Sequence, residues 1–192
     1  MLKSPLKWIG GKSKLFGSIS QHYPSEINNY HELFVGGGSA LIGLLDMVKR
    51  SKIKINGKIY AYDSNEVLIG FYKFLQTDYE ALYMKIFQLK NNLMYQKTKE
   101  EKEVEKKKKK DLTEEDKEIL KQMNGRRSDF YYQLRTIYNN RNLSGDKIAM
   151  FVFLNKTSFR GVFRLNKKGG YNVPYGNYDN PEIANKEHLK QV

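Results

Sequence analysis

Residues 31–39, His-Glu-Leu-Phe-Val-Gly-Gly-Gly-Ser, decide how the rest of the chain is arranged, and the apolar run 40–45 follows them directly. An apolar strand that runs into glycines and then into a helical pattern leaves unpaired helix N–H groups beside a tight turn. Glycine lets a ligand approach such a turn closely because it has no side chain. The spacing lacks the third glycine of the dinucleotide-binding motif and the lysine of a phosphate-binding loop. By itself, the turn fits a cofactor site and an ordinary strand–helix junction equally well.

A second signal, an acid, follows one helix and one strand later. Residues 58–66, Lys-Ile-Tyr-Ala-Tyr-Asp-Ser-Asn-Glu, predict a short buried strand that ends at Asp63, 25 residues after Gly38. That separation is typical of a βαβ unit. A carboxylate there can accept hydrogen bonds from both hydroxyls of a ribose, and it can also cap the next helix. The two signals together favour a ligand with a ribose and no phosphate, such as S-adenosylmethionine.

The N-terminal stretch 5–16 places the only tryptophan, Trp8, just before the turn formed by Gly10, Gly11 and Lys12. An amphipathic helix is expected at about residues 12–22, a strand at about 30–35, and a helix from the glycine turn to about residue 50. Trp8 is either a core residue or an apolar wall of the cofactor site. In the second case, Lys12 would place a positive charge near the carboxylate of the cofactor.

Composition narrows the function classes. The chain has 192 residues, 40% of them hydrophobic, without a run of eighteen apolar residues. Its first residues do not have the pattern of a signal peptide, so neither a membrane nor a secreted location is expected. The absence of cysteine excludes disulfides, thiol catalysis and thiolate metal sites, and three widely separated histidines do not favour a zinc site.

The net charge of +13 favours a polyanionic partner, and its location says where that partner binds. The Glu/Lys-rich stretch 97–127 holds twelve basic and nine acidic residues and is therefore nearly balanced. Segments 1–14 and 150–176 contain four and five basic residues, respectively, and no acid. We expect the anion-binding surface to lie where these two segments meet.

The second half of the chain reads as mostly helical. Apolar spacing predicts a helix over 66–96, and capping residues predict another that starts at Thr113. Between them, residues 97–121 are interpreted as a solvated helix or a mobile excursion rather than as a specific binding element. In 150–178, an apolar helix end leads to a turn at Gly161 and a hairpin with arms 162–166 and 171–174. Arginines interleaved with aromatic residues suit nucleic-acid recognition, and an exposed basic hairpin without a ligand is the alternative.

Four motifs, in this order and spanning nearly the whole chain, resemble the Dam-type DNA adenine-N6 methyltransferases. They are Leu6-Lys-Trp-Ile-Gly-Gly-Lys12, Glu32-Leu-Phe-Val-Gly-Gly-Gly-Ser39, Ala61-Tyr-Asp-Ser-Asn65, and Leu154-Asn-Lys-Thr-Ser-Phe-Arg-Gly-Val-Phe-Arg164 with Tyr171-Asn-Val-Pro-Tyr-Gly176. The resemblance implies an α/β fold, in which a Rossmann-like S-adenosylmethionine-dependent methyltransferase sheet carries a mostly helical target-recognition insertion with a β-hairpin. It also implies methyl transfer to an adenine flipped out of double-stranded DNA, in the cytoplasm or wherever that DNA lies.

The resemblance assigns residues to both parts of the site. The cofactor-binding positions are Trp8, Lys12 and Asp63, with Glu32, Phe34, Gly36 and Gly38 close by. Phe159 matches an aromatic wedge, and base contacts fall on Arg160, Val162 and Arg164, while phosphate contacts are expected from Lys156, Lys167 and Lys168. The expected domains are 1–66 for the cofactor, 67–178 for recognition, with the excursion 97–127 and hairpin 162–174, and 179–192 for a return to the catalytic domain.

One departure from the family is large. The catalytic tetrapeptide, Asp-Pro-Pro-Tyr or a near variant, should follow the hairpin, and it is absent from residues 1–192. Residues 172–175, Asn-Val-Pro-Tyr, are only similar in outline. We therefore expect the N-terminal part of a methyltransferase, incomplete in its sheet, with an exposed sheet edge and inactive alone. It is either a truncated product or one piece of a split enzyme that a catalytic segment completes in trans. The alternatives are a non-catalytic DNA-binding protein with the same scaffold and, less consistent with the acid-free hairpin, a small-molecule enzyme.

Overall fold

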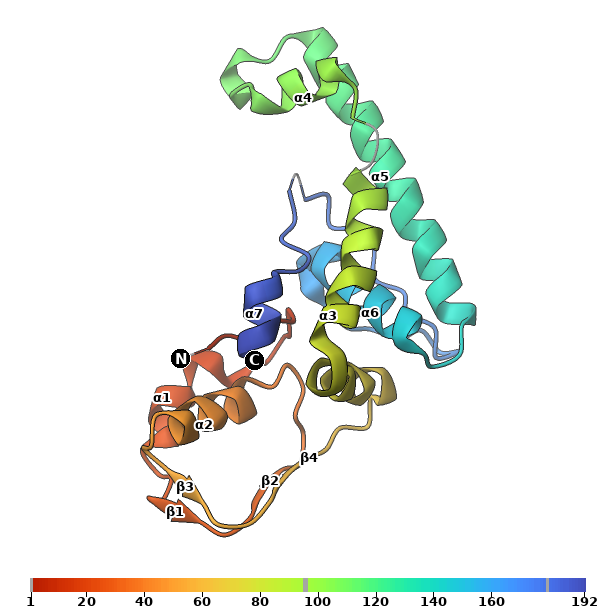
Figure 1. Ribbon diagram of the computed structural model, residues 1–192. Helices are drawn as coiled ribbons and strands as arrows, with labels where there is room; N and C mark the ends of the chain where they lie inside the picture. The colour runs from red at the N-terminus through yellow and green to blue at the C-terminus, as the bar shows by residue number, and fades with distance from the viewer. Residues whose placement is uncertain (1, 95–96, 179) are drawn as a thin grey trace.

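The computed structural model describes residues 2–94, 97–178 and 180–192, which form a mixed α/β, mostly helical structure (Figure 1). Its longer elements are helices, and its strands are short. The helices are α1 (Phe16–Ser20), α2 (Ser39–Lys49), α3 (Glu66–Met94), α4 (Lys99–Lys106), α5 (Glu114–Asn140), α6 (Gly145–Thr157) and α7 (Lys186–Gln191). The strands are β1 (Glu26–Ile27), β2 (Tyr30–Glu32), β3 (Lys54–Ile55) and β4 (Ile59–Ala61), and 3-10 turns occur at η1 (Lys12–Lys14), η2 (Lys109–Asp111) and η3 (Phe159–Gly161).

Two small parallel sheets lie at the end of the molecule that carries α1 and α2 (Figure 1). β1 pairs with β3, and β2 pairs with β4 so that Glu32 lies opposite Ala61. The parallel β2–β4 pair with α2 in its connection confirms the expected βαβ arrangement. In the described part of the chain each strand has one partner, which leaves the expected open edges. The prediction that the strand before Asp63 is buried was wrong: Tyr60 and Ala61 are exposed, because a two-stranded sheet covers little of either face.

The helix predicted at about 12–22 is broken into η1 and α1. Leu15 separates the two pieces with φ −94° and ψ −11°, and Gly17 lies inside the short second piece, where glycine weakens a helix. Phe16 nevertheless anchors this segment, since it is buried and a Cβ at Gly43 of α2 would lie 2.4 Å from its ring. The strand expected at 30–35 ends at Glu32, and the helix after the glycine turn ends at Lys49, close to the expected residue 50.

The long helices α3, α5 and α6 enclose the main core. The helix predicted over 66–96 is confirmed as α3 to Met94, and residues 95–96 lie outside the described residues. α3 kinks at Asp78, where the side chain accepts a hydrogen bond from the Ala81 N–H at 2.8 Å and restarts the helix. α6 packs against both α3 and α5 and is buried around most of its circumference; its fully buried side chains include Phe151, Phe153 and Leu154. Within the described residues, no helix combines the length and the apolar character needed to cross a membrane.

The Glu/Lys-rich stretch 97–127 folds into helices. Thr98 and Thr113 each form a reciprocal capping box, the first with Glu101 at the start of α4 and the second with Asp116 at the start of α5. The helix start predicted at Thr113 is therefore confirmed. α4 packs against the N-terminal part of α5, at the end of α5 farthest from the β-strands (Figure 1).

The predicted hairpin arms do not form strands. One antiparallel bridge joins Leu165 to Tyr171, and the Asn172 N–H donates to the Arg164 carbonyl at 3.1 Å, but no ladder continues from them. Side chains of α5 take its place. The Val173 carbonyl accepts hydrogen bonds from Tyr131 and Arg135, each at 2.9 Å. The backbone of Tyr171 is bonded in both directions to Asn139, so these groups are satisfied without a second strand.

The C-terminal helix α7 begins at Lys186, where the side chain of Asn185 accepts the His188 N–H at 3.1 Å and caps the helix. The ring of His188 also bonds the Lys3 carbonyl at 2.8 Å. This contact brings the C-terminal helix against the N-terminal segment that leads to Trp8.

Candidate functional site

A pocket of about 230 Å³ lies among the N-terminal turn, the glycine turn and the end of β4. Its walls come from residues 8–12, 34–37, 39–40 and 63, which β2, α2 and β4 bring together. Five of the seven predicted cofactor residues line it: Trp8, Lys12, Phe34, Gly36 and Asp63. Phe34 is 79% exposed at the pocket rim. Glu32 and Gly38 lie beside the pocket rather than in its wall.

The glycines of the turn are required in part by Trp8, which packs directly on the turn. Gly36 and Gly38 have φ of +47° and +73°, which side-chain-bearing residues rarely adopt. A Cβ at Gly36 would also lie 2.9 Å from Trp8 Nε1, and one at Gly37 would lie 2.6 Å from Trp8 Cβ. The close approach expected for a ligand is thus made in part by Trp8, which forms a pocket wall packed on the turn.

Asp63 is held by the backbone on both of its oxygens. Oδ2 accepts the Gly36 N–H and Oδ1 accepts the Asn65 N–H, each at 3.0 Å. Because each carboxylate oxygen has a further lone pair, the group can still accept hydrogen bonds from a ligand in the pocket. The alternative role in helix capping belongs to Asn65, whose side chain accepts the Leu68 N–H at 3.1 Å.

Lys12 is paired inside the site. Its ammonium lies 3.4 Å from Glu32 Oε1, and the other oxygen of Glu32 accepts a hydrogen bond from the Tyr30 hydroxyl. Burial and the contact with Glu32 raise the pKa of Tyr30, so this hydroxyl stays protonated and remains a donor. A carboxylate arriving near Lys12 would therefore compete with Glu32 for the ammonium.

Tyr72, which lies in the helix predicted over 66–96, also belongs to this site. Its hydroxyl donates to the Gly36 carbonyl at 3.0 Å. A Cβ at Gly38 would lie 2.5 Å from the Tyr72 hydroxyl oxygen, so this tyrosine also requires a glycine there. Burial, followed by the nearby Asp63 and Glu32 carboxylates, raises the pKa of Tyr72. The available signal was the residue type, since a tyrosine at a core position needs a partner for its hydroxyl.

Trp8 and the residue before it join the pocket to the second predicted site. The indole stacks on Phe163 with ring centroids 5.9 Å apart. Asn155, which is 2% exposed, accepts the Lys7 N–H at 2.9 Å and donates to the Lys7 carbonyl at 2.7 Å. The same amide nitrogen also donates to the Gly161 carbonyl at 3.2 Å. Sequence reasoning missed Asn155, because Lys7, with which it makes two of its hydrogen bonds, lies 148 residues away in the chain.

The predicted recognition residues form an exposed segment after α6. Phe159 is 49% exposed, and the guanidinium of Arg160, at φ +56°, lies 5.1 Å from the centre of its ring. Arg164 is exposed and donates to Asn172 Oδ1 at 2.9 Å. Lys167 and Lys168 lie at the exposed turn that follows.

Two members of the predicted recognition set are partly buried. Val162 packs against the main core. Lys156 is half-buried, and burial together with the nearby Lys7 ammonium lowers its pKa. Lys7 donates to the Lys156 carbonyl at 2.9 Å and lies over the ring of Tyr178. The acid-free segments 1–14 and 150–176 therefore do meet, as expected from the charge distribution.

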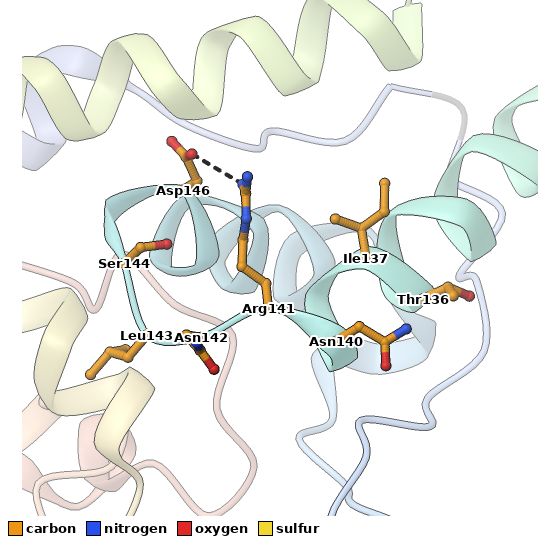
Figure 2. A pocket seen from close by; sticks show the side chains of 8 residues that line it. All are labelled: Thr136, Ile137, Asn140, Arg141, Asn142, Leu143, Ser144 and Asp146. Carbon is orange, nitrogen blue, oxygen red and sulfur yellow. Dashed lines mark hydrogen bonds and ion pairs between the residues drawn. The ribbon is translucent and has the colours of Figure 1, made fainter.

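Another hollow, of about 650 Å³, opens at the turn between α5 and α6 and contains none of the predicted site residues (Figure 2). Its two charged lining residues, Arg141 and Asp146, are paired at 3.0 Å, as Figure 2 shows. Lys85 also contacts Asp146 at 2.7 Å. The charged groups of this hollow are thus paired with each other or with Lys85. The chemical groups that suit a cofactor lie instead at the glycine turn.

Residues 8–192 match the family model of the D12 class N6 adenine-specific DNA methyltransferases. The chain belongs to this family. A type II methyltransferase, M.MjaIII of Methanocaldococcus jannaschii, is 34% identical over 100% of this chain and 58% of its own length. The type II methyltransferase M1.LlaDCHI of Lactococcus lactis is 27% identical over 97% of the chain and 52% of its own length.

A DNA adenine methylase of Vibrio cholerae is 28% identical over 95% of this D12 class chain and 50% of its own length. The chain thus spans about half the length of the curated relatives it matches. Its residues 172–175, similar in outline to the family tetrapeptide, have a packing role: Val173 and Tyr175 are buried, and the Val173 carbonyl is bonded to α5.

Proposed function

We propose that this chain provides the S-adenosylmethionine-binding and target-recognition parts of a site-specific DNA adenine-N6 methyltransferase. The main support is that Trp8, Gly36 and Asp63, which are distant in sequence, line a single pocket. In this proposal, residues 1–66 form the Rossmann-like cofactor part, 67–178 the recognition part, and 179–192 the return toward the catalytic domain.

The chemistry of the pocket fits a nucleoside without a phosphate. Asp63 places a negative charge against the glycine turn, where it would repel a phosphate but can accept ribose hydroxyls. Trp8 offers an apolar wall, and Lys12 can exchange Glu32 for the carboxylate of an amino-acid group. S-adenosylmethionine combines these three features, and when bound it supplies the methyl group.

The exposed segment after α6 suits recognition of duplex DNA. Phe159 can wedge between base pairs, and the fork of Arg164 can pair with a guanine edge in the major groove. Lys167 and Lys168 can neutralise phosphates without reading sequence. Arg160 lies next to the wedge, where it can reach the base pair that the wedge opens.

A cofactor titration tests this proposal through the single tryptophan. Because Trp8 lines the pocket, S-adenosylmethionine should change its fluorescence in a saturable way. Asp63→Asn should weaken this binding at least tenfold, since the substitution removes the charge and one of two accepting oxygens. Asp129→Asn, at an exposed position of α5, is the matched control and should bind as the unmodified chain does. Equal affinities for all three proteins would contradict the ribose assignment.

A methyl-transfer assay on mixed-sequence duplex DNA tests the catalytic part. The acid or amide that accepts a hydrogen bond from the adenine amino group is not identified within residues 1–192. We therefore expect cofactor binding without methyl transfer by this chain, and transfer on addition of a segment that carries the tetrapeptide, supplied in the same chain or in trans. Methyl transfer by the chain alone would overturn this assignment of the catalytic group.

A further inference from the structure

The ion pairs of the 97–127 excursion divide its lysines into two groups. Five are paired with acids of the excursion: Lys97, Lys106, Lys107, Lys117 and Lys121. Five others are exposed and form no ion pair within the described residues, and we call them the basic tip: Lys99, Lys102, Lys108, Lys109 and Lys110. Two of the unpaired acids, Glu100 and Glu115, lie in first helical turns, where the helix dipole favours them, and Asp111 is the third.

The basic tip borders a hollow of about 860 Å³ between α4 and α5. Seven of the lining residues are cationic and two are acidic, and Lys99, Lys102 and Lys109 of the tip are among them. The near balance of charge in the sequence of this stretch is thus not reproduced in the lining of the hollow. Six of the nine acids are used in internal pairs, and the five unpaired lysines outnumber the three unpaired acids, so positive charge remains for an anionic partner.

The basic tip and the recognition segment lie along the same face of α5. The buried residues of this helix form one stripe: Asp116, Met123, Arg127, Tyr131, Leu134 and Tyr138. At the start of the stripe, Asp116 binds Lys107 at 2.8 Å, and Arg127 binds Glu105 of α4 at 2.7 Å. At its end, Tyr131 binds the Val173 carbonyl, and Tyr138 packs on Tyr171.

The spacing along α5 matches a duplex. Nineteen residues separate Asp116, which holds the tip, from Arg135, which holds the recognition segment. At a rise of about 1.5 Å per residue the two points are about 28 Å apart. Phosphates follow one another about every 3.4 Å along a strand of B-DNA, so this distance corresponds to about eight base pairs.

We propose that the basic tip binds the phosphates of the same DNA duplex that the recognition segment contacts, about eight base pairs from it. This inference rests on the proposed function, since it requires duplex DNA at the recognition segment. The tip lies at the opposite end of the molecule from α2, beside which the cofactor pocket opens (Figure 1). In this proposal its lysines contact phosphates as point charges, so the tip adds affinity and footprint length without adding sequence preference.

Fluorescence anisotropy with two mixed-sequence duplexes tests the proposal. A 6-base-pair duplex closed by a hairpin loop is shorter than the proposed separation and cannot fill both surfaces, whereas a 24-base-pair duplex can fill both. The triple variant Lys108→Gln, Lys109→Gln, Lys110→Gln should lose on the order of tenfold in affinity for the longer duplex and about 2 to 3 in the slope against log salt concentration. Its affinity for the shorter duplex should stay within about twofold of the unmodified chain.

The control removes the same charge at the opposite end of the molecule. Lys49→Gln, Lys52→Gln, Lys58→Gln changes three exposed lysines near the β1–β3 pair, and it should bind both duplexes as the unmodified chain does. Equal losses for the two triple variants, equal losses on both duplexes, or no loss for the tip variant would each overturn the proposal. If the unmodified chain bound neither duplex, the proposed recognition of DNA would fail as well, which distinguishes the two failures.

Discussion

The glycine-turn region, residues 2–65, and the helical region that follows it are stabilised differently. The buried residues of the main core come almost entirely from the helical region; among the described residues before 66, only Leu6 and Val35 join it. The glycine-turn region buries a few residues outside that core, such as Phe16 and Leu44. Its strands have two or three residues each. The candidate cofactor pocket is therefore built on the part with the smaller core.

A few contacts hold the pocket against the larger core. Trp8 stacks on Phe163, Asn155 binds both backbone groups of Lys7, and Tyr72 binds the Gly36 carbonyl. Each of them joins the first 36 residues to a helix or to the segment after α6. The pocket should consequently depend on the helical region, while the helical region should fold without the pocket. Substitutions in either region can test this dependence.

The largest effect is expected from the core itself. Phe153 is fully buried in α6, and Phe153→Ala should lower the free energy of unfolding by about 3–5 kcal/mol, because it leaves a cavity. Binding of cofactor and of DNA should both weaken. Phe16→Ala should instead abolish only cofactor binding. Urea titrations followed by circular dichroism and by Trp8 fluorescence would separate the two, and an equal loss of DNA binding in Phe16→Ala would show that the regions are not independent.

A smaller effect is expected at Asn155, where the two regions are tied, because Lys7 is only half-buried and its backbone groups can take water as a partner in a variant. Asn155→Ala leaves the Lys7 N–H and two carbonyls without a partner, and each such group costs about 1–3 kcal/mol when it stays buried. We expect faster hydrogen exchange at the Lys7 amide and weaker cofactor binding, with unchanged exchange in the middle of α3. Asn91→Ala, at an exposed position of α3, is the control. Unchanged exchange at Lys7 would remove Asn155 from this role.

The features that could be predicted from the sequence are those that depend on near neighbours. Three such features depend only on residues that are close in sequence: the cap at Thr113, the periodicity of α3 and the strand–glycine–helix order around Gly36. The spacing of one βαβ unit was enough to place Asp63 beside that turn. Local propensity and hydrophobic period carry this information, because they act over three to seven residues.

The features that could not be predicted depend on partners distant in sequence. The second arm of the predicted hairpin is hydrogen-bonded to side chains of α5 that lie more than thirty residues earlier in the chain. The local turn residues predict two strands, because they carry no information about these distant partners. Lys12 could be recognised as a charge, but not as the partner of Glu32. Asn155 and Tyr72 have ordinary local surroundings, and only the packing of two regions gives them their contacts.

Two single substitutions in the recognition segment test whether it both reads base sequence and contacts phosphates. Arg164→Ala should cost about 1–3 kcal/mol on the preferred sequence and relax the preference at one base pair, because a bidentate contact to a guanine is lost. Lys167→Ala should weaken binding to all sequences alike and reduce the salt slope by about 1. Binding of both variants to a randomised duplex library, followed by sequencing, would measure this. Equal losses on every sequence for both variants would contradict the reading role of Arg164.

The smallest effect is expected at the far end of α5, where polar contacts replace a core. Hydrogen bonds from Lys107, and then from the Thr113 N–H, hold the pKa of Asp116 below its ordinary value. A carboxyl with a depressed pKa in the folded state adds stability above its unfolded pKa, about 3.9, and that contribution disappears as the pH falls through the depressed value. The junction of α4 and α5 should therefore loosen below about pH 4, while the main core is unaffected.

Asp116→Asn isolates this contribution. The amide oxygen can still accept the Thr113 N–H, so the cap is kept, but the charge that binds Lys107 is lost at every pH. After correction for intrinsic exchange rates, amide exchange at residues 113–116 should accelerate on acidification in the unmodified chain. In the variant, the corrected exchange should be fast at every pH, because the ion pair with Lys107 is absent throughout. Identical acid profiles for the two proteins would mean that α4 is held by its apolar contacts, such as Val104, and that the excursion shares the stability of the core after all.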